Sequence, residues 1–145
     1  MKSCQALLAV CVCPVLPLHG ADLSDLIYTT TDVKVTITGC KTSASGELVI
    51  PDTIEGKPVT SIEFNAFLRC TNLTSITIPD SVTSIRLGAF GDCASLTAVI
   101  FLGDAPKEGK DVFKDSVPTI YRKPEAKGWG DTWGRRPVKL ISEKP

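Results

Sequence analysis

The sequence contains a single histidine, His19, and has few aromatic residues (6%) among its 145 positions. Without histidine, the chain beyond residue 19 cannot form a Ser-His-Asp or Cys-His catalytic arrangement. The usual structural zinc site is also excluded there, because the three cysteines that remain are far apart in the sequence. Basic and acidic side chains balance at 16 each. This balance gives no reason to expect a nucleic acid or an anionic membrane as a partner.

Residues 1–21 have the pattern of a secretory signal peptide. Lys2 supplies a positive charge, the run QALLAVCVCPVLPL is apolar, and HGA offers small residues for cleavage. The apolar run is shorter than the ~20 residues that a membrane-spanning helix needs, and no later run reaches that length. A lipidated Cys11 or Cys13 is the less favoured alternative, because valine precedes both. We therefore expect an exported protein, located in the periplasm, at the cell surface or in the medium.

Three phenylalanines mark an internal repeat. Phe67, Phe90 and Phe113 are 23 residues apart, and the surrounding segments correspond. The segment VTSIEFNAFLRC is followed by LTSITIPDSVTSIRLGAFGDC and then by the weaker ASLTAVIFLGDAPKEGKDVFKDS. A unit of 23 residues has too little core to fold alone, so the units must stack and share one core.

Each unit contains two extended pieces and one turn. In LTSITI the residues Leu73, Ile76 and Ile78 face inward, and β-branched residues favour a strand. Pro79-Asp80 ends this strand, VTSI is a second short extended piece, and LGAFGDC forms one helical or 3₁₀ turn. The predicted core of the stack includes Ile62, Phe67, Cys70, Ile85, Phe90, Cys93 and Phe113.

These repeats resemble the BspA-like leucine-rich repeats, a 23-residue type common in bacterial surface and secreted proteins. The resemblance implies a mostly β solenoid with short helical or 3₁₀ turns and a parallel sheet along its concave side. The last unit departs from the pattern, since Ser116 replaces the cysteine, which suggests a closing unit.

Four segments are expected along the chain: a signal peptide (1–21), an N-terminal β cap (22–46), about three repeats (47–119) and a C-terminal cap (120–145). The N-terminal cap is predicted to be a strand pair with alternating Val33, Val35 and Ile37. In the C-terminal cap, Trp129 and Trp133 are expected to plug the open end of the core. An aromatic platform for sugar is the alternative.

The cysteines of adjacent repeats are expected to lie side by side. One strand spacing (~4.8 Å) between the Cα atoms of Cys70 and Cys93 would permit a disulfide, and export makes oxidation possible. Buried thiols are the favoured interpretation, because cysteine packs well as a small apolar residue. Cys40 has no partner by register.

The function is predicted to depend on the outward side chains of the parallel sheet. They are short and largely uncharged, which suits an extended peptide or a loop of a partner. The expected function is non-enzymatic recognition or adhesion, with a protein or a surface glycan as partner. A self-assembling surface spacer is an alternative, and a carbohydrate-active enzyme is a remote one, because acidic residues occupy turn positions. No catalytic, cofactor-binding or metal-binding residue is predicted, and the predicted ligand-binding residues are Val49, Ser75, Thr77, Ala98 and Ile100.

Overall fold

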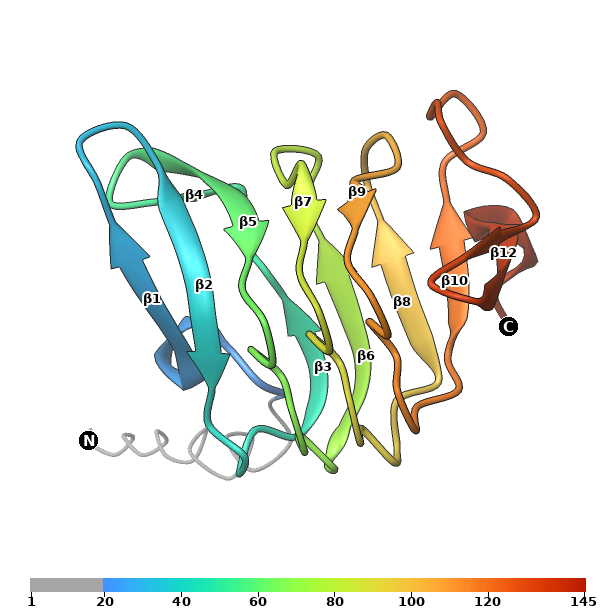
Figure 1. The fold of residues 1–145 in the computed structure, drawn as a ribbon, viewed down its shortest axis with the longest axis horizontal. Coiled ribbons are helices and arrows are strands. Elements are labelled where there is room, and N and C mark those ends of the chain that lie inside the picture. Colours follow the sequence, from blue (N-terminus) through green and yellow to red (C-terminus); the bar gives the residue numbers. More distant parts are fainter. Residues whose placement is uncertain (1–19) are drawn as a thin grey trace, which may run out of the picture.

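The computed structural model describes residues 20–145, so the predicted signal peptide lies almost wholly outside the described residues. The described chain winds as a β-solenoid whose coils each contribute strands to two sheets (Figure 1). No helix among the described residues has the length and apolar character needed to cross a membrane. The fold class predicted from the repeat is confirmed, and both sheets are largely parallel.

The first sheet, here called the long sheet, contains five parallel strands that follow the coils from one end of the molecule to the other. A short strand, β11, joins the last of them in an antiparallel hairpin. In spatial order the strands are β3 (Gly46–Val49), β6 (Leu73–Ile78), β8 (Ala98–Phe101), β10 (Thr119–Arg122), β12 (Arg136–Leu140) and β11 (Thr132–Trp133).

The second sheet, here called the short sheet, lies in front of the long sheet in Figure 1. It begins with the antiparallel pair β1–β2 and continues in parallel through later coils, with β4 paired to β5 in a hairpin. Its strands are β1 (Leu26–Thr30), β2 (Val35–Cys40), β4 (Thr53–Ile54), β5 (Lys57–Ile62), β7 (Ser84–Ile85) and β9 (Lys107–Glu108).

Turns at residues 64–69, 87–92 and 110–115 complete the coils. Some N–H groups bond three residues back, as in a 3₁₀ turn: the Leu68 N–H donates to the Asn65 carbonyl at 3.1 Å. The alternate N–H groups instead donate to the next coil, as from Phe67 to Ala89 (2.7 Å). The turns therefore form a third hydrogen-bonded ladder, called the turn ladder below. Among residues 20–145, the 3₁₀ helices η2 (Leu23–Asp25) and η3 (Ile141–Glu143) lie outside the repeats.

The core is organised around a file of phenylalanine rings. The ring centroids of Phe67 and Phe90 are 5.1 Å apart, and those of Phe90 and Phe113 are 5.5 Å apart. Interplanar angles of 16° and 19° make both pairs stacked. Equivalent residues therefore lie in rows, as the 23-residue interval requires. The other predicted core residues, Ile62, Cys70, Ile85 and Cys93, are also buried.

The hairpin β1–β2 covers one end of the solenoid, and β2 pairs in parallel with β5 of the first coil. Val35 and Ile37 are fully buried. Val33 differs from the expected alternation, since it lies before β2 in the link from β1 and is 71% exposed. The alternating burial therefore begins only where the strand does.

The opposite end is closed by the two tryptophans. The Trp133 ring packs edge-on against Phe101 and Phe113, with centroid distances of 5.1 and 5.9 Å. Its Nε1 donates to the Pro106 carbonyl at 3.2 Å. Trp129 packs on Phe101 at 4.9 Å and donates to the Gly103 carbonyl. This packing is that of a plug.

A hairpin near the start of the repeats is repeated in the C-terminal cap. The segment DTIEGKPV forms the β4–β5 hairpin, and DTWGRRPV forms the equivalent β11–β12 hairpin. The same bond closes each one: the Val59 N–H donates to Asp52, and the Val138 N–H donates to Asp131, both at 2.9 Å. The cap is thus built from a motif that the repeat region already uses.

Candidate recognition surface

The outer face of the long sheet presents one row of side chains across successive coils. Because side chains alternate along a strand, the residues next to the buried Ile76 and Val99 point outward. Strand register places these outward residues beside one another on neighbouring strands. The row, here called the outer row, is Val49, Thr77, Ile100, Tyr121 and Lys139.

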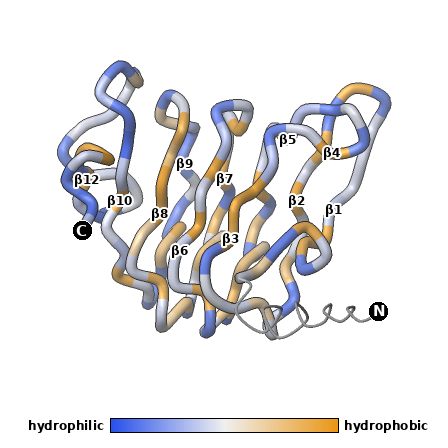
Figure 2. Tube along the Cα trace, turned by 180° about the vertical axis from the view of Figure 1, so that it is seen from behind, coloured by the Kyte–Doolittle hydropathy of each residue, from blue (hydrophilic) through white to orange (hydrophobic). Residues whose placement is uncertain are grey.

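Three of the predicted ligand-binding residues lie together in the outer row. Val49 is 62% exposed, and Thr77 and Ile100 are partly exposed. They form an uncharged surface on three adjacent strands. Figure 2 shows this side of the molecule, with hydrophobic residues along β8.

The other two predicted residues, Ser75 and Ala98, lie in the neighbouring outward row. They are only 8% and 6% exposed, and so present little surface to a partner. The physical reason is their size: strands are ~4.8 Å apart, and small side chains between longer neighbours lose contact with solvent.

Tyr121 and Lys139 complete the row by strand register and were not found from the sequence, but Tyr121 is only 6% exposed, so Lys139 alone adds accessible surface. Ile100 pairs with Tyr121, which is 21 residues later, whereas the 23-residue interval points to Lys123. The last coil is therefore two residues short at this point. The β-branched and aromatic run TIYR could have located the strand, and Ile120 continues the buried row of Ile76 and Val99.

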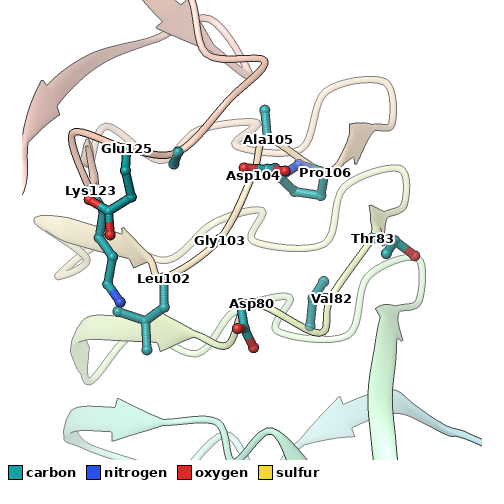
Figure 3. A pocket seen from close by; sticks show the side chains of 11 residues that line it. Asp80, Val82, Thr83, Leu102, Gly103, Asp104, Ala105, Pro106, Lys123 and Glu125 are labelled. Atoms are coloured by element: carbon teal, nitrogen blue, oxygen red, sulfur yellow. The ribbon is translucent and has the colours of Figure 1, made fainter.

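A hollow of about 440 Å³ lies where the chain passes from the long sheet to the short sheet (Figure 3). Lys123 and Glu125 flank it, and Asp80, Val82 and Thr83 line the adjoining coil. Asp104 also lines it, and its carboxylate accepts a hydrogen bond from the Lys127 N–H at 2.8 Å, which is a structural role. Within residues 20–145, no three His, Cys, Asp or Glu residues are grouped so as to hold a metal ion.

A second hollow, of about 480 Å³, lies over β7 and β9 on the short sheet. Its polar lining is mainly cationic, with Arg86, Lys107 and Lys110. Arg86 pairs with Glu63 of the preceding coil at 3.4 Å. Ion pairs this exposed contribute little to stability, so the pair mainly aligns neighbouring side chains.

The three described cysteines are free thiols. Cys70 and Cys93 occupy equivalent places, as the register predicted, and no bond joins them. The Cys93 thiol donates to the Phe67 carbonyl oxygen at 3.0 Å. Burial raises the pKa of the Cys93 thiol to about 12, with the nearby Cys70 thiol adding to the effect.

Comparison with known proteins identifies the repeats. A family described as "BspA type Leucine rich repeat region" matches residues 42–121 in six copies, which is more than half of the chain. The chain therefore belongs to the family of BspA-type leucine-rich repeat proteins. No curated protein matches it significantly.

Solved structures with the same fold come from bacterial leucine-rich repeat proteins. A T. pallidum leucine-rich repeat protein is 19% identical with a TM-score of 0.54, over 83% of this chain and 64% of that one. A leucine-rich cell surface protein from Faecalibacterium prausnitzii A2-165 is 25% identical with a TM-score of 0.52, over 68% of this chain and 31% of that one. The chain thus spans less than two thirds of either relative.

Proposed function

We propose that this protein is an exported recognition module that binds a protein segment or a surface glycan through the outer row of its long sheet. The observation that carries the proposal is the exposure of Val49 beside Thr77 and Ile100, in register on three adjacent strands. These side chains are short, uncharged and held on a hydrogen-bonded sheet. A rigid surface of this kind loses little conformational freedom on binding.

The charged groups at the two ends of the long sheet fit the same proposal. Glu47 lies on β3 at one end, and Lys139 lies on β12 at the other, both exposed. The centre between them is neutral. A neutral centre with charges at its rim suits an extended peptide or loop better than a charged polymer.

A non-enzymatic role is part of the proposal. Two carboxylates near the hollows have structural partners: Asp104 accepts the Lys127 N–H, and Asp111 pairs with Arg135 at 3.5 Å. Fold alone does not decide function, so the proposal depends on these side chains and not on the solenoid.

Export is proposed from two observations. Residues 1–21 have the charge, apolar run and small residues of a signal peptide. A cell surface protein is also among the structures that the chain resembles.

The test uses the double substitution T77E/I100E. The purified protein is screened against an array of surface glycans and a panel of extracellular proteins, and affinity for each hit is then measured. Two charges in the centre of the outer row should weaken binding by tenfold or more, since they must be desolvated in the complex.

The matched control is L87E/V117E. Leu87 and Val117 are 49% and 72% exposed and lie away from the outer row. This variant should bind like the parent protein, and both variants should keep the parent's thermal transition. Full affinity in T77E/I100E would exclude the outer row as the binding surface.

A further inference from the structure

One position in each coil holds a small polarisable or polar side chain against the preceding coil. Cys93 donates to the Phe67 carbonyl oxygen at 3.0 Å, and Ser116 donates to the Phe90 carbonyl oxygen at 2.7 Å. Both groups are therefore engaged by a short hydrogen bond to a backbone oxygen of the coil before. Both are also buried.

Cys70 occupies the same position in the first coil, but its surroundings differ. Counting back 23 residues from Phe67 gives Ala44, and the Cys70 thiol makes no hydrogen bond to the carbonyl oxygen of that residue. The Cys70 thiol instead faces the Lys41 carbonyl oxygen, at 4.0 Å. Cys70 is therefore only weakly engaged by the backbone.

The place beside Cys70 is taken by another thiol. Cys40 is the last residue of β2, immediately before Lys41, and its partly exposed side chain packs against the core that contains Cys70. The Cys40 thiol lies close enough to the Cys70 sulfur for the two groups to interact. This contact lowers the pKa of the Cys70 thiol and raises that of Cys40, so the pair gives up its first proton readily and its second only with difficulty.

We propose that Cys40 and Cys70 form an oxidation site, which closes to a disulfide and ties the hairpin β1–β2 to the first coil. The oxidant is a low-molecular-weight disulfide, RSSR. The site is independent of the outer row and of the proposed binding function.

The reaction balances as two thiol–disulfide exchanges. The pair holds one thiolate, which resides mainly on Cys70 and becomes reactive at Cys40 when the Cys40 proton passes to the Cys70 sulfur. The more exposed Cys40 sulfur then attacks one sulfur of RSSR, forms a mixed disulfide and releases RS⁻. Cys70, as its thiolate, then attacks the Cys40 sulfur, forms the protein disulfide and releases the second RS⁻. The two protein thiols together lose two electrons and two protons, and RSSR becomes two RSH.

Cys93 is the internal control, because it should stay reduced. Cys93 is 1% exposed, and its thiol donates to the Phe67 carbonyl oxygen. A thiol whose pKa is raised by burial supplies almost no thiolate at neutral pH, and the thiolate is the nucleophile.

Tryptic peptides separate the three cysteines. Cleavage after lysine and arginine places Cys40 in residues 35–41, Cys70 in residues 70–86 and Cys93 in residues 87–107. The reduced, folded full chain is incubated with glutathione disulfide, quenched with an alkylating agent, digested and analysed by mass spectrometry. We expect a disulfide-linked pair of peptides 35–41 and 70–86, with peptide 87–107 alkylated.

Two further measurements keep the result specific. The thermal midpoint should rise on oxidation by roughly 5–10 °C, because the bond closes a loop of about 30 residues, and the rise should be absent in C40S. C93S should form the bond as readily as the parent protein. The same chain oxidised in guanidinium gives the level of random pairing.

Three outcomes would overturn the proposal. One is a bond that links peptides 70–86 and 87–107. Another is glutathione that stays on Cys40 without closure. The third is a 35–41/70–86 link no more abundant in the folded protein than in guanidinium.

Discussion

The residue that follows each core phenylalanine by three positions joins two coils. In the second coil it is Cys93 and in the third it is Ser116, and both donate to a phenylalanine carbonyl. Ser116 also accepts a hydrogen bond from the Cys93 N–H at 2.8 Å. Cysteine and serine are therefore interchangeable in geometry at this position, and they differ in acidity.

That difference predicts a pH dependence of stability. The pKa of Cys93 is about 12 in the folded protein and near 9.0 for an unperturbed thiol, so unfolding above pH 9 releases a proton. Stability should be complete below about pH 9 and should fall as pH rises towards 12, with this thiol contributing at most about 1.4 kcal/mol per pH unit. C93S should lose less stability over the same range, measured by urea unfolding at pH 7, 9 and 10.5. Parallel losses in the two proteins would contradict the assignment.

At the scale of elements, the turn ladder ends abruptly. The Phe90 N–H donates to Val112 at 2.9 Å, and the Asp92 N–H donates to Lys114 at 2.8 Å. In the last coil, the equivalent N–H groups of Phe113 and Asp115 have no acceptor in the described part of the chain. The C-terminal cap covers the Phe113 ring, yet it leaves this edge of backbone unpaired.

Hydrogen exchange should detect this edge. Amides bonded between coils exchange only when the coil opens, whereas an unpaired amide near the surface exchanges freely. We expect the amide of Asp115 to exchange at least tenfold faster than that of Asp92, measured by NMR at pH 7. Equal protection would mean that another group pairs with the last turn.

At the scale of the whole molecule, the sequence predicts the solenoid because its interval is regular. Phe67, Phe90 and Phe113 identify the interval, and stacking follows because no single unit has a sufficient core. The prediction weakens wherever the interval changes. Tyr121 was missed because the last coil is two residues short.

Prediction from the sequence also fails in parts of the caps, for a different reason. Cys40 lies before the first repeat, where no interval assigns a partner, and only the packing of β2 on the first coil brings it to Cys70. The hairpin around Gly56 was not predicted from the sequence, and a positive φ of 75° at this glycine lets the chain turn there. The alternation of side chains along the strand correctly placed Ser75 and Ala98 on the outer face. Both are nevertheless buried, because exposure also depends on the size of the neighbouring side chains across the sheet.

The solenoid as a whole consists of coils that rest directly on one another in sequence order. Nuclear Overhauser contacts between aromatic ring protons test this arrangement in solution. Ring contacts should appear between Phe67 and Phe90 and between Phe90 and Phe113, whose centroids are 5.1 and 5.5 Å apart, and be absent between Phe67 and Phe113. A direct contact between the first and third rings, or none involving Phe90, would contradict the stack.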